Sequence, residues 1–180
     1  MNNLLKEKQG IGVIICRMQV PYLTDSHKAM IETVLNRHRR VIIFLATTNK
    51  PVDPKNPFPF EFRKKMILST FEDNDDINIV PLPDQKDDNA GWVRTLDQFI
   101  QTFLAYEEEP VLYGGRDSFI PYYQDDNGKF KCVELSPNDY DSGTDLRHLI
   151  SIEQPQYSKE AAAAILWTLR QVTKKEENAN

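Results

Sequence analysis

Two side chains suited to phosphate chemistry, Thr24 and His27, stand where the sequence predicts the start of a helix. They belong to CRMQVPYLTDSHKAM (16–30), which follows the apolar run IGVIIC (11–16) and carries Arg17 near its beginning. The first turn of a helix has unpaired N–H groups and a partial positive charge, which favour phosphate. Hydroxyl and imidazole donors there could stabilise in-line nucleotidyl transfer, which needs charge stabilisation more than a protein nucleophile. By residue type alone, such a histidine is more often a surface or capping residue.

A second candidate phosphate site lies late in the chain, in DSGTDLR (141–147). Ser142, Gly143 and Thr144 would present N–H and hydroxyl donors at an expected helix start. Arg147, one turn later, could bind triphosphate oxygens through its forked guanidinium. As a bare sequence the segment predicts a helix start and nothing more. Its position after the last expected strand is what favours a second phosphate site.

A third candidate is the segment YGGRDSFIPYY (113–123), which follows another expected strand. Gly114 and Gly115 would let the backbone approach a ligand closely. Arg116 could reach a phosphate. We expect the two tyrosines at the end of the segment to pack in the core rather than to contact a ligand.

Two further segments are candidates for binding an acceptor molecule. NPFPFEFRKKMI (56–67) carries Asn56 and an Arg-Lys-Lys cluster that begins at Arg63, for which a solvated helix face is an equal alternative. Trp92 could stack on a flat, electron-poor ring. It also begins an apolar helical stripe, so burial in the core is an equal alternative.

Alternating strands and helices are expected to position these residues. The first two expected strands are almost continuously apolar, which is typical of parallel strands covered on both faces. The expected strands are 11–16, 41–46, 77–80, 110–113 and 130–135, and the expected helices are 25–38, 59–71, 91–106, 116–123 and 158–175. Thr24 or Asp25 is available as the first N-cap. This order predicts an α/β protein with a doubly wound, parallel, five-stranded sheet. The ligand site of such a fold lies at the carboxyl ends of the strands, and we expect the irregular stretch 47–58 to line it.

Composition narrows the class of protein. A chain of 180 residues fits a single domain (1–180), with a core of about 10–155. The net charge of −5 argues against a general nucleic-acid binder. No run of residues is long and apolar enough for a membrane helix. The two cysteines and the lack of a signal-peptide pattern favour the cytoplasm. The sequence lacks the P-loop, GxGxxG, HExxH and CxxC motifs. Its three histidines predict no metal cluster, and we expect His38 and His148 to be structural or exposed.

The helix-start segment resembles the HIGH-motif nucleotidyltransferases. Thr24 and His27 occupy the two signature positions of the H/TxGH motif. The wider RMQVPYLTDSH is similar to the GRFQPFHxGH stretch of nicotinamide-mononucleotide adenylyltransferases, a likeness carried by Arg17 and Gln19. Ser26 replaces the signature glycine, and the loop from Arg17 to His27 is two residues longer than in that pattern.

The other segments resemble motifs of the same enzymes, in the same order along the chain. Residues 56–67 are similar to the NPFxxxER motif, with Asn56 and Arg63 aligned without gaps. Residues 113–123 resemble GHRKDxSxYY, and residues 141–147 are similar to the SSTxIR element. Trp92 lies in the region where these enzymes place a tryptophan against the nicotinamide ring.

The resemblance, which is closest to the archaeal-type and Nudix-fused enzymes but without a Nudix domain, implies an activity. It implies transfer of AMP from ATP, with Mg²⁺, to nicotinamide mononucleotide, giving NAD and pyrophosphate. The implied site residues are Thr24, His27 and Arg147 for catalysis, Arg17, Gln19, Arg116, Ser142, Gly143 and Thr144 for the nucleotide, and Asn56, Arg63 and Trp92 for the acceptor, with no protein metal site. Three alternatives stay open: CTP as donor, another phosphorylated acceptor, and a non-catalytic nucleotide-binding regulator. Many of the enzymes it resembles form oligomers, so a homo-oligomer also stays open.

Overall fold

The fold is known from a computed structural model that describes residues 8–48, 56–72, 74–85, 88–105, 108–115 and 118–135. Five strands alternate with four helices in these ranges. They are β1 (Gln9–Cys16), α1 (Asp25–Arg37), β2 (His38–Thr47), α2 (Phe60–Thr70), β3 (Ile77–Pro83), α3 (Asn89–Gln101), β4 (Val111–Gly114), α4 (Ile120–Asp125) and β5 (Lys131–Glu134). The expected helix 158–175 and five expected site residues lie outside the described residues; those site residues are Arg116, Ser142, Gly143, Thr144 and Arg147.

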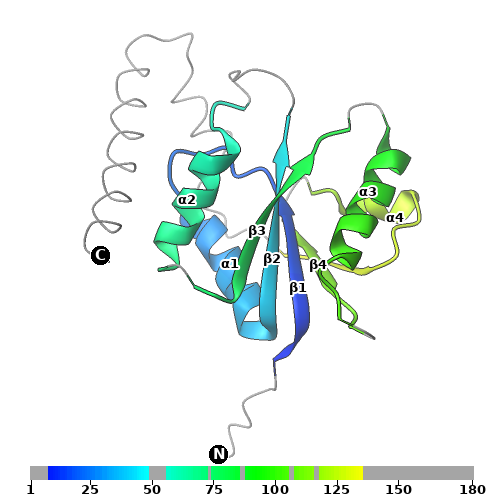
Figure 1. The fold of residues 1–180 in the computed structure, drawn as a ribbon, viewed down its shortest axis with the longest axis horizontal. Coiled ribbons are helices and arrows are strands. Elements are labelled where there is room, and N and C mark those ends of the chain that lie inside the picture. The colour runs from blue at the N-terminus through cyan, green and yellow to red at the C-terminus, as the bar shows by residue number, and fades with distance from the viewer. Residues whose placement is uncertain are drawn as a thin grey trace, which may run out of the picture.

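The five strands form one parallel sheet in the order β3-β2-β1-β4-β5. The chain first builds outward from β1 to β3 and then returns to add β4 and β5 on the other side. Helices α1 and α2 cover one face, and α3 and α4 cover the other (Figure 1). The doubly wound α/β fold predicted from the alternating pattern is therefore confirmed, and β1 stands beside the point where the strand order reverses.

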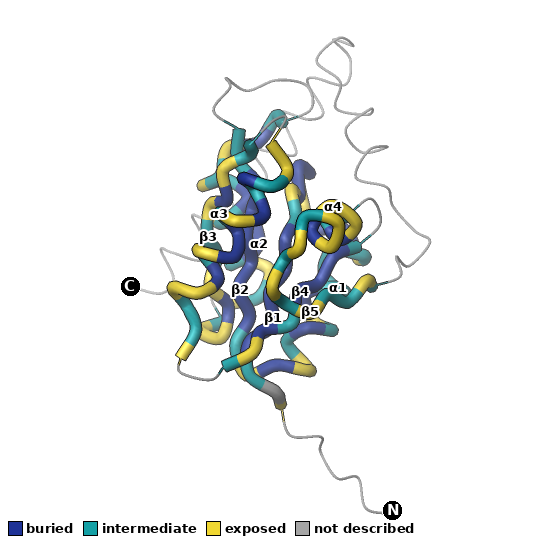
Figure 2. Tube along the Cα trace, turned by 90° about the vertical axis from the view of Figure 1, so that its right-hand side faces the viewer, coloured by how far each residue is buried: buried dark blue, intermediate teal, exposed yellow. Residues whose placement is uncertain are grey.

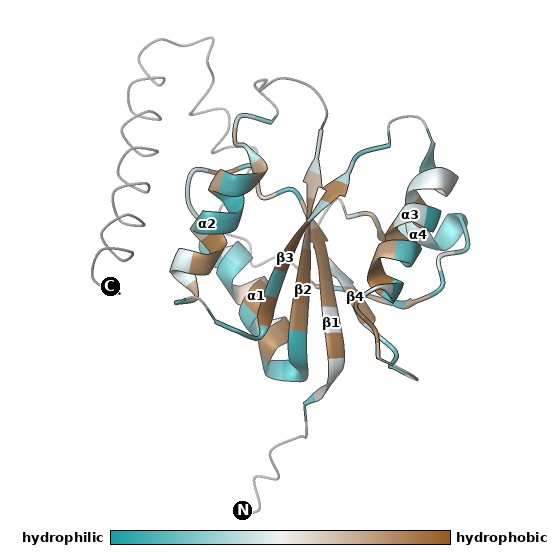
Figure 3. Cartoon of the chain, viewed as in Figure 1, coloured by the Kyte–Doolittle hydropathy of each residue, from teal (hydrophilic) through white to brown (hydrophobic). Residues whose placement is uncertain are grey.

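The core is divided between the two faces of the sheet. Strands β1 and β2 are almost wholly buried (Figure 2), because both of their faces are covered by helices. Alternate residues of β1 face opposite sides: Ile14 packs with the α1 and α2 side, whereas Ile11 and Val13 pack with the α3 and α4 side. The apolar runs seen in the sequence are these central strands (Figure 3).

Several element ends differ from the expected ones. β4 begins at Val111 rather than 110, since Pro110 has no N–H to donate to a neighbouring strand. α3 ends at Gln101 rather than 106, where the backbone N–H of Phe103 turns to the carbonyl of Ile100. α4 begins only at Ile120, four residues later than expected. Among the described residues, no helix is both long and apolar enough to cross a membrane.

Two buried polar pairs stabilise the packing, one between strands β2 and β4 and one between helices α3 and α4. His38 Nε2 lies 2.7 Å from the Tyr113 hydroxyl, and an added Cβ at Gly12 would lie 2.7 Å from the His38 ring, so this glycine gives the ring its space. His38 is therefore structural, as expected. On the other face, the buried Tyr123 donates to Asp97. The core expectation holds for Tyr123 and is wrong for Tyr122, whose exposed fraction is 57%.

Candidate nucleotide-binding site

The polar residues that follow β1 and β3 meet at the carboxyl edge of the sheet. Arg17, directly after β1, forms an ion pair with Asp84, directly after β3, with 2.7 Å between Nη2 and Oδ2. Its Nη1 lies 3.5 Å from Oδ1 of Asn56. The Arg17 side chain is about half exposed, so its guanidinium stands at the open edge of the sheet. This meeting of loops supports the expectation, drawn from the alternating pattern, that the ligand site lies at this edge.

Thr24 and His27 form one hydrogen-bonded unit at the start of α1. Thr24 is the N-cap, and its Oγ1 accepts the backbone N–H of His27 at 3.3 Å. The same oxygen lies 2.8 Å from Nδ1 of the His27 ring. Thr24 is 2% exposed, whereas His27 is partly exposed. The structure therefore brings the two signature residues together, with the imidazole as the more accessible member.

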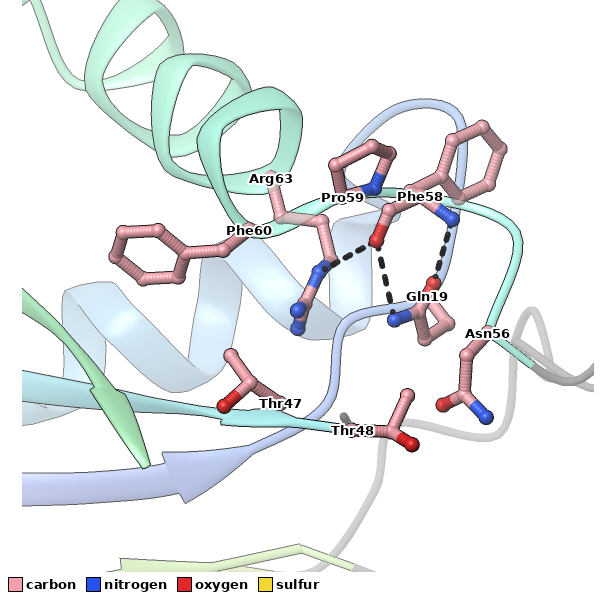
Figure 4. Close-up of a pocket in the computed structure, with 8 residues that line it drawn as sticks. All are labelled: Gln19, Thr47, Thr48, Asn56, Phe58, Pro59, Phe60 and Arg63. Carbon is pink, nitrogen blue, oxygen red and sulfur yellow. Dashed lines mark hydrogen bonds between the residues drawn. The ribbon is translucent and has the colours of Figure 1, made fainter. Parts of the chain in front are cut away.

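A pair of buried hydrogen bonds joins the β1–α1 loop to the chain before α2. The Gln19 side-chain amide accepts the Phe58 N–H at 2.9 Å and donates to the Phe58 carbonyl at 3.3 Å (Figure 4). Gln19 is 3% exposed. Both ends of its amide thus hold backbone, and Gln19 orients the loop rather than presenting its amide to solvent.

Arg63 is the most heavily bonded side chain of this region. Its Nε donates to the Phe58 carbonyl at 3.1 Å, and its Nη1 donates to the carbonyls of Arg17 at 2.6 Å and Ala46 at 3.1 Å. The residue is 2% exposed, and burial lowers the pKa of its guanidinium, with the charge of Arg17 acting in the same direction. The solvated-face alternative for Arg63 is therefore wrong. We call Arg17, Gln19, Phe58 and Arg63 the loop junction, because they tie together the chain after β1, the end of β2 and the chain before α2.

A pocket of about 250 Å³ opens beside the loop junction. Side chains from the end of β2 and from the chain before α2 face it, as Figure 4 shows. Its lining consists of Gln19, Thr47, Thr48, Asn56, Phe58, Pro59, Phe60 and Arg63. The hydroxyl and amide groups of this lining would suit a polar ligand. Thr47, Thr48, Asn56 and Phe58 of the stretch 47–58 thus line a pocket, and that this pocket belongs to the ligand site stays a prediction.

Two aromatic residues that could have faced a ligand are engaged in packing. Phe62, at the glutamate position of the NPFxxxER pattern, stacks on Phe58 with 5.0 Å between ring centroids. Trp92 lies on α3, partly buried against the core, with its ring 6.0 Å from that of Phe119. Trp92 therefore belongs to the opposite face of the sheet from Arg63, and the core interpretation accounts for the packed part of its ring.

Cys16 ends β1, and its surroundings oppose the ionisation that a nucleophilic thiol needs. Burial raises the pKa of its thiol to about 12, against the opposing charge of Arg63. Asp84, which pairs with Arg17, is the residue of this candidate site that the sequence did not single out. Its signal in the sequence was weak, because the expected strand 77–80 ends four residues before it. Among the described residues, no three His, Cys, Asp or Glu side chains lie close enough together to hold a metal ion.

Comparison with known proteins supports the resemblance drawn from the motifs. No family model matches the chain. The nicotinamide/nicotinic acid mononucleotide adenylyltransferase of Acinetobacter baylyi is 31% identical over 112 residues, which are 61% of this chain and 59% of that protein. This chain thus spans less than two thirds of the length of the curated relative.

Solved structures show the same fold. The bifunctional NMN adenylyltransferase/ADP ribose pyrophosphatase of Francisella tularensis matches with a TM-score of 0.70 and 24% identity, over 78% of this chain and 41% of that one. A second structure of that protein holds AMP and a manganese ion. NadR protein in complex with NAD and AMP-PNP matches with a TM-score of 0.57 and 14% identity, over 78% of this chain and 42% of that one. In sequence and in fold, this chain resembles the nicotinamide-mononucleotide adenylyltransferases.

Proposed function

We propose that this chain transfers AMP from ATP to nicotinamide mononucleotide. An oxygen of the mononucleotide's 5′-phosphate attacks the α-phosphorus, the bond from that phosphorus to the bridging oxygen breaks, and pyrophosphate leaves, so that NAD forms. The observation that carries the proposal is the Thr24–His27 unit at the start of α1, the helix that follows the central strand β1. The sequence likeness to a nicotinamide/nicotinic acid mononucleotide adenylyltransferase supports the choice of substrates.

The reacting phosphates would lie at the N-terminus of α1. The positive end of the helix dipole at this N-terminus favours an anionic ligand. His27 would donate to a phosphate oxygen on which charge grows during transfer, and Arg17 would add positive charge from the end of β1. Arg116, Arg147, Ser142, Gly143 and Thr144 lie outside the described residues, and their proposed contacts with the triphosphate rest on the motifs alone.

Mg²⁺ is the proposed accompanying cation. It characteristically keeps few protein ligands and binds through substrate phosphates. It would draw charge from the triphosphate, while the chain's own residues position the α-phosphorus.

The acceptor would bind beside the loop junction. Asn56 lines the pocket there, and Arg63 shapes it by holding the surrounding carbonyls. Trp92 stays a proposed contact for the nicotinamide ring through the part of its surface that the core leaves uncovered.

Pyrophosphate release tests the proposal and separates its rivals. Purified protein with Mg²⁺ is given ATP or CTP, each with nicotinamide mononucleotide, nicotinic acid mononucleotide or phosphopantetheine. We expect the fastest release with ATP and nicotinamide mononucleotide. Pyrophosphate release only with another pair would overturn the proposed identity of the acceptor or the donor. ATP binding without pyrophosphate release would favour a non-catalytic regulator, an alternative that the serine at position 26 in place of glycine supports.

Replacement of His27 tests the site itself. His27→Ala should lower kcat by roughly 10² to 10³-fold, the loss typical of a preorganised donor to a developing oxyanion. Asp25→Ala is the matched control, because Asp25 is exposed in the same helical turn. Turnover of His27→Ala equal to that of Asp25→Ala would remove His27 from the mechanism.

A further inference from the structure

The hydroxyl proton of Thr24 has one acceptor within reach among the described residues. Thr24 Oγ1 already accepts the backbone N–H of His27, and the other polar atom beside it is Nδ1 of the same histidine, 2.8 Å away. A side chain that is 2% exposed cannot turn its proton to solvent without cost. The hydroxyl therefore donates to Nδ1, which must be the unprotonated ring nitrogen.

This geometry determines the tautomer of the neutral imidazole. A neutral histidine carries one ring proton, and the hydrogen bond made by one nitrogen decides where that proton sits. If Nδ1 accepts from Thr24, the proton lies on Nε2. The opposite tautomer would bring two donors to Thr24 Oγ1 and leave the buried hydroxyl proton without its acceptor.

We propose that Thr24 is a positioning residue that holds His27 in the Nε2–H tautomer, the form in which Nε2 donates a hydrogen bond to a phosphate oxygen. This inference rests on the proposed function for its consequence and on the hydrogen bonds for its geometry. It gives Thr24 a role through His27, since its own hydroxyl is buried and already paired. The other tautomer would present a lone pair at Nε2, which a phosphate oxygen repels.

Thr24→Asp separates this role from helix capping. Aspartate caps a helix start at least as well as threonine, because a carboxylate oxygen accepts the same backbone N–H. A carboxylate has no proton to give to Nδ1 and would instead accept one from it. The variant should therefore keep α1 and reverse the tautomer. Thr24→Ser keeps both the cap and the hydroxyl, and is the matched control.

Nitrogen-15 NMR of the imidazoles reads the tautomer directly and does not depend on turnover. Spectra of histidine-labelled protein are recorded at about pH 8.5, some two units above the ordinary histidine pKa, and His27→Gln assigns the signals. We expect an Nε2–H imidazole in wild type and in Thr24→Ser, and an Nδ1–H imidazole in Thr24→Asp. An Nδ1–H imidazole in wild type would overturn the inference, whether or not any variant folds. So would an unchanged Nε2–H signal in folded Thr24→Asp.

Kinetics tests the consequence. In the pyrophosphate assay, Thr24→Asp should lose about 10² to 10³-fold in kcat, like His27→Ala, whereas Thr24→Ser should stay within about threefold of wild type. Thr24→Asp that turns over like wild type despite a reversed tautomer would overturn the positioning role. If wild type releases no pyrophosphate with any pair, the proposed function fails, and the spectra still decide the tautomer.

Discussion

Replacing Arg63 with methionine should destabilise the protein by about 2–4 kcal/mol. The side chain donates to three backbone carbonyls while 2% exposed. The Phe58 carbonyl would keep the Gln19 amide as a donor, so two carbonyls, those of Arg17 and Ala46, lose the guanidinium. Hydrogen bonds to a charged group contribute roughly 1.5–3 kcal/mol each, which gives about 3–6 kcal/mol for two. Methionine recovers part of this, because it fills similar space and removes the desolvation cost of a buried charge.

Urea unfolding measures this loss. With an m value of about 2 kcal/mol per molar urea, the midpoint should fall by roughly 1–2 M at an unchanged slope. Arg63→Lys should fall between wild type and methionine, since an ammonium lacks the fork that reaches separate carbonyls. Lys64→Met is the control on the same helix, and its expected change is within about 0.5 kcal/mol.

One result would refute the reasoning. If Arg63→Met unfolds at the same midpoint as Lys64→Met while KM for the acceptor rises, then Arg63 serves as a ligand contact and the loop junction contributes little to stability.

Two further predictions follow from buried titratable groups. Burial, with the nearby charge of Arg37, lowers the pKa of His38, so the unfolded chain binds more protons. The stability from neutral His38 is present above about pH 6.5 and lost as pH falls through the lowered pKa. The urea midpoint of wild type should therefore drop more between pH 7.5 and 5 than that of His38→Gln, and equal drops would contradict it. Burial also raises the thiol pKa of Cys16 to about 12 and of Cys132 to about 11. At about pH 8 the thiolate fraction of each cysteine is then on the order of 10⁻³ or less. A thiol reagent should therefore label the folded protein slowly and the urea-unfolded protein faster. Rapid labelling of folded protein would refute the raised thiol pKa values.

The sheet could be predicted because its two central strands have a distinctive apolar pattern. The runs around Ile14 and Phe44 are apolar on both faces, which only a doubly covered strand requires. The ends of the elements were less predictable, because single local features decide them. Pro110 lacks a backbone donor directly before β4, and α4 begins at Ile120, four residues later than expected. Neither effect changes the periodicity from which a helix or strand is recognised.

The site was predictable in its local parts and not in its long-range ones. Thr24 is the N-cap and His27 lies three residues later, so the local geometry of a helix start brings them together. By residue type alone, Arg63 suited a solvated helix face as well as an acceptor site, because nothing in its neighbourhood of lysines shows that the carbonyls of Arg17 and Ala46 accept from it. The partnership of Arg17 with Asp84 joins the ends of two strands that are separated in the sheet by β2. Such contacts depend on the paths of loops, which carry no periodic signal.

The loop junction also limits what kinetics alone can say about Arg17. Arg63 holds the carbonyl of Arg17, while Asp84 and Asn56 hold its guanidinium. Substitutions at these positions should therefore not be additive, because each shifts the same side chain. A loss of nucleotide binding in Arg63→Met would follow from displacement of Arg17 even if Arg63 touches no nucleotide. Only a variant that keeps the urea midpoint and still loses nucleotide binding identifies a residue in contact with the ligand. Arg17 is the member of the loop junction that should behave in this way, because its side chain is half exposed at the carboxyl edge.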